Sequence, residues 1–66
     1  MYMPEDAINA FRKNSDGSWT CIKPTMIFGY GGIINIEPCR AFNKGTLYWG
    51  IDMVAFFEEN ITARSD

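Results

Sequence analysis

The first part of the chain alternates between turn residues and β-favouring residues. The turn sequence at 14–17 contains an Asp-Gly pair, which is typical of a β-hairpin, so we expect strands at 10–13 and 18–23. Residues 4–11 permit two interpretations. Pro4 followed by two acidic residues is typical of the start of a short helix, whereas an extended segment leads directly into the first strand. We favour the extended segment, because the hairpin turn follows so soon.

A second pair of apolar runs surrounds a glycine-rich stretch. Residues 25–28 and 33–37 flank the turn at 29–32, where several positions are free to adopt positive φ, and they predict a second hairpin. Successive side chains of a strand point to opposite faces, so we expect Ile34 and Ile36 to share one face of the sheet. The glycine-rich stretch is not followed by a helix and lacks the P-loop lysine, so we interpret it as a turn and not as a phosphate site.

The last third of the chain predicts two further short strands and a helix. We expect strands at 41–42 and 46–49, the second ended by Gly50. Asp52 is placed to cap a helix over 53–60, with Ile51 and Phe56 at the spacing of a hydrophobic staple. The apolar stripe of this helix has helical spacing and consists of Met53, Phe56, Phe57 and Ile61.

These elements predict a β-rich α+β fold. Four or five short antiparallel strands would form a small sheet or an open SH3-like or OB-like barrel, with the single C-terminal helix covering its open side. A chain of 66 residues is one small domain, spanning 1–66, and we expect residues 1–8 and 62–66 to be flexible. A core of this size is only marginally stable alone, which favours a partner.

Composition excludes several functions. The chain has no His, so imidazole bases, Ser-His or Cys-His pairs and mixed Cys/His zinc sites are all excluded, and we expect no catalytic residue, metal or cofactor. No apolar run has the length of a membrane span, and the acidic N-terminus is not a secretory signal, so we expect a cytoplasmic protein without membrane contact. Cys21 and Cys39 are interpreted as reduced, mostly buried thiols.

The aromatic content of 15% is high for so small a core. We expect Tyr30, at a glycine-rich tip, and one of the consecutive rings Tyr48 and Trp49 to be exposed and to bind a partner. The first hypothesis is therefore a non-enzymatic protein-interaction module of the adaptor or inhibitor type, of the small acidic kind that phages and mobile elements also encode. It would bind another protein, or a second copy, through this aromatic patch or a sheet edge.

The alternative hypothesis is a weak single-stranded nucleic-acid-binding β-barrel, in which bases stack on rings beside positive charges. Residues 42–50 resemble the Lys-Gly-aromatic strand of cold-shock domains, although the aromatic alternation of that family is absent and a helix follows. A net charge of −2 disfavours strong binding to phosphates. The residues expected to bind nucleic acid are Trp19, Lys23, Arg40 and Lys44.

Overall fold

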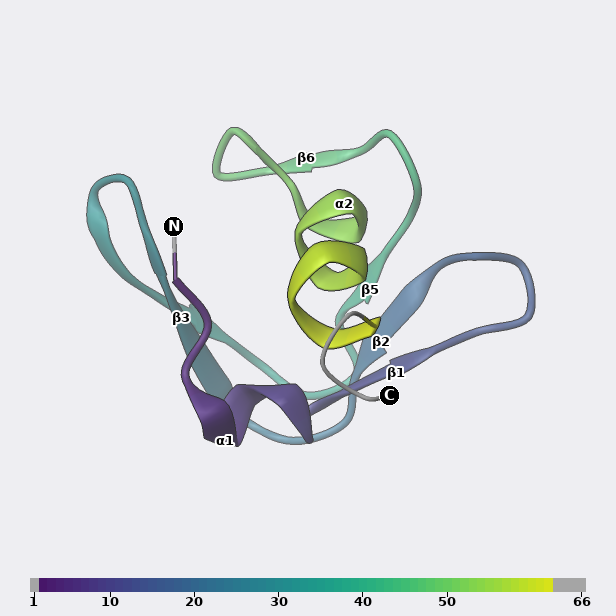
Figure 1. Ribbon diagram of the computed structural model, residues 1–66, viewed down its shortest axis with the longest axis horizontal. Coiled ribbons are helices and arrows are strands. Elements are labelled where there is room, and N and C mark those ends of the chain that lie inside the picture. The colour runs from purple at the N-terminus through teal and green to yellow at the C-terminus, as the bar shows by residue number, and fades with distance from the viewer. Residues whose placement is uncertain (1, 63–66) are drawn as a thin grey trace.

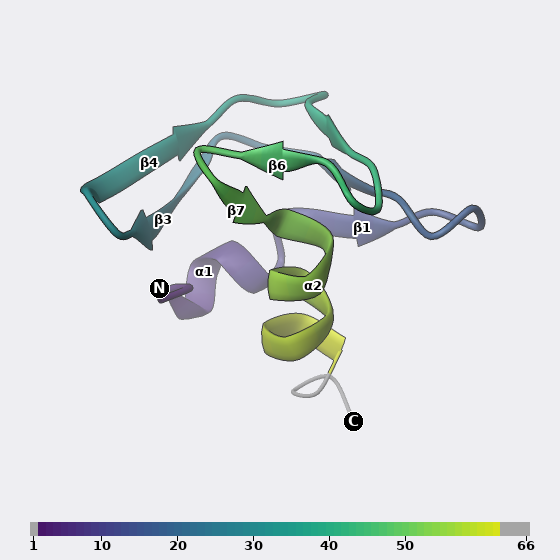
Figure 2. The same ribbon diagram turned by 90° about the horizontal axis from the view of Figure 1, so that it is seen from above.

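The computed structural model describes residues 2–62, which form short antiparallel strands and helices joined by tight turns (Figure 1). In chain order the elements are α1 (Glu5–Ile8), β1 (Phe11–Lys13), β2 (Trp19–Cys21), β3 (Thr25–Gly29), β4 (Gly32–Ile36), β5 (Ala41–Phe42), β6 (Leu47–Tyr48), β7 (Ile51–Asp52), α2 (Met53–Phe57) and the π-helical turn η1 (Glu58–Thr62). The two α-helices lie on the same side of the strands (Figure 2).

The strands form three small sheets. The first has the order β1-β2-β5, β3 pairs with β4, β6 pairs with β7, and every pairing is antiparallel. The β-rich antiparallel fold with a C-terminal helix is thus confirmed. Within the described residues the three sheets do not close into a barrel, so the SH3-like or OB-like form stays a prediction. The described residues contain seven strands and not four or five, because the brief run at 41–42 pairs as β5 and the chain reverses after β6 and returns as β7.

The N-terminal segment contains the short helix that we did not favour. Pro4 has φ −62°, which suits a helix start, and α1 follows it, so the extended interpretation is wrong over these residues. Met3 and Ala7 are fully buried, and Tyr2 exchanges two backbone hydrogen bonds of 2.8 Å with Phe28 of β3. Residue 1 and residues 63–66 lie outside the described residues, and the flexibility expected for 1–8 and 62–66 stays a prediction.

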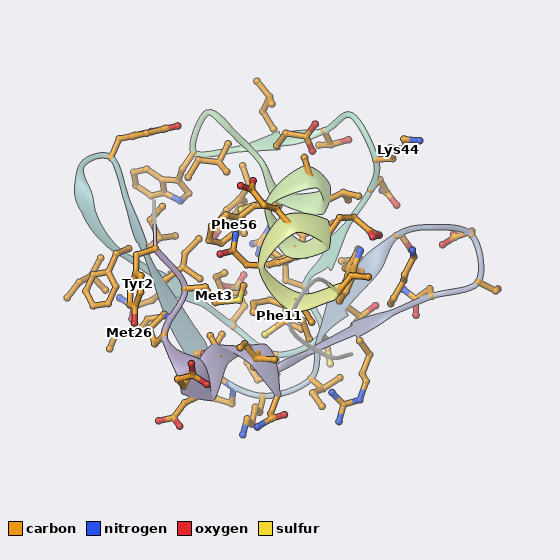
Figure 3. All side chains as sticks on the ribbon, viewed as in Figure 1. Tyr2, Met3, Phe11, Met26, Lys44 and Phe56 are labelled. Atoms are coloured by element: carbon orange, nitrogen blue, oxygen red, sulfur yellow. The ribbon has the colours of Figure 1, made fainter. Side chains whose placement is uncertain are left out.

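The core is built around the ring of Phe57. Its centroid lies 4.3 Å from that of Phe11, 5.4 Å from those of Trp19 and Phe42, and 6.1 Å from that of Phe56. These rings come from β1, β2, β5 and α2, so one side chain joins the three-stranded sheet to the helix. The apolar stripe predicted for the helix is entirely buried. Figure 3 shows Phe11 and Phe56 in the interior of the molecule beside α2.

The helix begins as the sequence predicts. Asp52 is the N-cap, and its Oδ1 accepts a hydrogen bond of 3.2 Å from the Ala55 N–H. Ile51 and Phe56, the expected staple pair, are both buried. The helical turns run to Thr62, two residues beyond the predicted end, because the coil widens into a π-helical turn after Phe57.

Polar side chains fix the first hairpin turn. The Asp16 carboxylate accepts hydrogen bonds from the Ser18 hydroxyl at 2.6 Å and the Ser18 N–H at 2.9 Å, while Gly17 adopts φ +91°. Both bonds lower the pKa of Asp16, and the bond from the Ser18 hydroxyl has the larger effect. The Asn14 amide donates to the Ser18 hydroxyl at 3.0 Å. The Asp-Gly hairpin expected at 14–17 is confirmed.

We expect Asp16 to make the stability of the protein fall in acid. Since the folded-state pKa is lower than the unfolded one, its contribution is present above about pH 4 and disappears as the pH falls through the lowered value. Asp16→Asn keeps the shape but removes the titration, so its stability will depend less steeply on pH between about pH 5 and pH 2. Urea unfolding at several pH values measures this. Equal pH dependence in the two proteins would contradict the assignment.

The two thiols differ in accessibility, contrary to the expectation that both are mostly buried. Cys21 is buried, its Sγ donates to the Lys23 carbonyl at 3.0 Å, and burial raises its thiol pKa. Cys39 is exposed at φ +70°.

We therefore expect a thiol reagent to modify one cysteine in the folded protein and two in denaturant. Counting the released chromophore measures this, and Cys39→Ser should leave the folded protein unreactive. Equal reaction of both thiols in the folded protein would show that the burial of Cys21 is wrong.

Candidate functional site

The side chain of Trp49 occupies a two-residue turn and is 74% exposed. Tyr48 pairs with Ile51, so Trp49 and Gly50 form the loop of the β6–β7 hairpin. Their φ values are +53° and +75°, and positive φ at both positions is the signature of a type I′ turn. The expectation that Trp49 continues the strand is wrong, because the chain reverses at this residue. The result is an indole ring projecting from a tight turn.

Tyr30 lies at the tip of the longer β3–β4 hairpin and is 82% exposed. Gly29 and Gly32 form the last pair of β3 and β4, so Tyr30 sits in the two-residue loop between them. The β3–β4 and β6–β7 tips lie at the same end of the molecule in both views (Figures 1 and 2). A Cβ at Gly29 would lie 3.5 Å from Ile51 Cδ1, and both residues flank the turns, so the two hairpins approach each other beside their tips.

We call Tyr30 and Trp49 together the tip surface. Exposed apolar side chains flank both rings along the neighbouring strands. Ile33 of β4 is 59% exposed and Leu47 of β6 is 62% exposed. Two short loops held by paired strands therefore present the rings in fixed positions. Such an arrangement suits contact with a second molecule, because little loop ordering is lost on binding.

Tyr48 does not belong to the tip surface. Its ring is half-buried and packs edge-on against Phe42, with centroids 5.3 Å apart at 84°. The Arg40 guanidinium lies 5.0 Å from the ring centroid, and its Nε donates to Glu37 Oε1 at 2.8 Å. The hydrogen bond from Arg40 lowers the pKa of Glu37. The structure therefore brings together two of the three residues predicted to bind a partner, and the third supports the core.

The residues predicted to bind nucleic acid are dispersed. Trp19 is 3% exposed and packs on Phe57, so its ring is inaccessible to a base and is corrected to a core residue. Arg40 is paired with Glu37. Lys44 lies in the β5–β6 turn, whereas Lys23 lies in the β2–β3 connection on the other side of the molecule (Figures 1 and 3). No groove of rings and positive charges is assembled from this set.

The segment that resembles a cold-shock strand adopts a different conformation. Lys44 and Gly45 lie in a turn, where Gly45 has φ +84° and the Thr46 N–H donates to the Asn43 carbonyl at 3.1 Å. The strand that follows is only two residues long. This segment therefore offers no long strand on which successive bases could stack.

Comparison of the chain with models of known protein families, with curated proteins and with solved structures finds no match.

An open groove of about 380 Å³ lies between α1 and β3. Its lining carries a single carboxylate, that of Asp6, and the uncharged polar side chains of Thr25 and Asn35 among prolines and apolar residues. Residues 2–62 contain no cluster of three or more Cys, Asp or Glu side chains suited to a metal ion. Over the same residues, every helix is too short or too polar to cross a membrane.

The sequence interpretation missed the exposed apolar face of the β3–β4 hairpin. The strand alternation of Ile34 and Ile36 is confirmed, but the opposite face carries Ile33 and Met26, both exposed. Tyr2 and Met26 lie close together on this outer side in Figure 3. Consecutive apolar residues such as Ile33 and Ile34 are typical of strands covered on both faces, and that signal was available in the sequence.

Proposed function

We propose that the chain is a non-enzymatic module that binds a partner protein through Tyr30 and Trp49. The observation that supports this most is the backbone conformation of Trp49. A bulky residue at positive φ costs on the order of 1–3 kcal/mol, and such costs gather at functional sites. The indole ring is largely exposed, so it adds little to the core in return. Contact with another molecule accounts for a tryptophan at this position.

The chemistry of the tip surface supports a protein partner. Tyr and Trp are enriched among the residues that dominate protein interfaces, because they bury a large area with few rotatable bonds. The two rings lie beside Ile33 and Leu47, and neither ring is paired with a positive charge among the described contacts. An adaptor or inhibitor works through such a rigid, largely apolar contact. The two free cysteines fit the reducing cytoplasm, where we place this activity.

The proposal is tested by affinity capture from the native cells with quantitative mass spectrometry. The wild-type chain is compared with Trp49→Asn, Tyr30→Ser and the control Ile22→Asn. Ile22 is also an exposed apolar residue, but it lies in the β2–β3 connection, away from the tips. Loss of a residue that dominates an interface weakens binding by roughly thirtyfold or more. We therefore expect both tip variants, and not the control, to lose the captured partner.

Two results would count against the proposal. One is a partner that both tip variants retain at the wild-type level while circular dichroism shows them folded. The other is a partner lost equally in the Ile22→Asn control, which would indicate general adhesion of apolar surface. The nucleic-acid alternative has less support, since Trp19 is buried and Arg40 is paired. It predicts quenching of Trp49 by single-stranded oligonucleotides at low salt.

A further inference from the structure

The backbone of β4 has one free edge. Phe28 directs its N–H and C=O toward Tyr2, so the alternation of an antiparallel pair makes Ile27 and Gly29 the residues that bond to β4. Their partners are Ile34 and Gly32. The N–H and C=O groups of Ile33 and Asn35 therefore point away from β3, and no hydrogen bond to them is present within residues 2–62. In Figure 2, β4 lies at the rim of the molecule.

The other sheet edges are protected in ways that β4 lacks. The outer edge of β3 is covered by Tyr2 and bounded by Pro4 and Pro24, which cannot donate to a further strand. β1 has three residues, two of them charged, and β5, β6 and β7 have two residues each. β4 has five residues and contains neither a charged residue nor a proline. It is the one long, unprotected edge within the described residues.

We propose that β4 pairs with β4 of a second copy of this chain, forming an antiparallel four-stranded sheet about a two-fold axis. With Ile34 on the axis, Ile33 of each copy faces Asn35 of the other copy, and the free N–H and C=O groups of these residues form four hydrogen bonds. The order of the strands becomes β3-β4-β4-β3. Ile33 also flanks the tip surface, but the groups that pair are backbone groups of β4 and not the rings of Tyr30 and Trp49, so the inference does not depend on the proposed function.

The charge pattern and the exposed apolar face favour a second copy as the partner that pairs with β4. A two-fold axis brings identical residues together, and the absence of charge between Gly32 and Ile36 means that no like charges meet there. Glu37, the next residue, is already neutralised by Arg40. The outer apolar faces of the β3–β4 hairpins of the two copies, with Phe28 and Ile33, then join into one surface. A five-residue strand pair buries less than the 1,200–2,000 Å² of a stable interface, so a weak dimer is expected.

Sedimentation velocity over a range of concentrations, with a reducing agent to prevent a Cys39 disulfide, tests the dimer. We expect a dissociation constant between about 1 μM and 1 mM for the wild-type chain. Ile33→Lys introduces the charge that protects natural edge strands and should weaken the dimer at least about tenfold. The control is Met26→Lys, which places the same charge on the same outer face but on β3, opposite Asn35, and should preserve the dimer.

Amide hydrogen exchange locates the interface without any substitution. The amides of Ile34 and Ile36 bond to β3 and should be protected at every concentration. Those of Ile33 and Asn35 should exchange freely in dilute protein and become protected as the dimer forms. A chain that stays monomeric at about 1 mM would overturn the inference. So would a dimer in which Ile33 and Asn35 exchange freely, or one that Ile33→Lys and Met26→Lys affect equally.

Discussion

Phe57→Ala is expected to leave the protein largely unfolded. Removing a fully buried phenylalanine costs about 3–5 kcal/mol, and the ring of Phe57 contacts four other aromatic rings of the core. A domain of this length has a total stability of roughly 3–10 kcal/mol. The substitution therefore removes a large part or all of the free energy of folding. Far-UV circular dichroism and the fluorescence of the buried Trp19 will show the loss.

Tyr30→Ala is the matched control for this experiment. It also removes an aromatic ring, but the ring is 82% exposed, and such substitutions change stability by less than about 0.5 kcal/mol. A urea titration of both variants and the wild type gives the comparison. If Phe57→Ala unfolded at nearly the wild-type urea concentration, the helix would not be docked on the three-stranded sheet through this ring, and the core described above would be wrong.

The parts of the fold with strong local signals were predictable from the sequence. The Asp52 cap and the helical spacing of Met53, Phe56 and Phe57 fixed the position and the buried face of α2. The Asp-Gly pair at 16–17 fixed the first hairpin in the same way, because turn geometry and register are set by neighbouring residues. These predictions depend on contacts within a few residues.

The failures arose where contacts distant in sequence decide the structure. α1 is only four residues long, which is too short for stability by itself, and the burial of Met3 and Ala7 against the rest of the chain holds it in place. The order β1-β2-β5 likewise depends on contacts distant in sequence, because these three strands meet around Phe57. Exposure of Tyr30 was foreseen, since its glycine-rich turn places it at a tip. Trp19, assigned to the nucleic-acid alternative, is buried instead, because β2 is the central strand of its sheet and the ring packs on Phe57.

Trp49 was misplaced for a different reason. A tryptophan after Leu47 and Tyr48 continues a β-favouring run. Its preference for strands therefore predicts a longer strand in place of the turn that Gly50 makes possible. Local preference and native conformation therefore conflict at this residue. Such conflicts are expected where a side chain serves a purpose other than folding, which connects this error in the prediction with the proposed binding role.

Trp49→Asn is expected to stabilise the protein by about 1 kcal/mol, although it removes the large indole side chain from the β6–β7 turn. Asn adopts positive φ readily and is favoured at this position of a type I′ turn, whereas Trp is not. The ring is 74% exposed, so little packing is lost. The free energy of unfolding from urea titration, followed by circular dichroism because a tryptophan is removed, measures the gain.

Trp49→Ala separates the backbone effect from the loss of the ring. Alanine also lacks the indole, but its Cβ keeps the cost of positive φ, so Asn at this position should be more stable than Ala by about 1 kcal/mol. A destabilising Trp49→Asn substitution would mean that the ring supports the fold and would contradict the proposed binding role. A gain in stability joined to a loss of partner binding would show that the turn holds the indole in a costly conformation for the sake of contact with another protein.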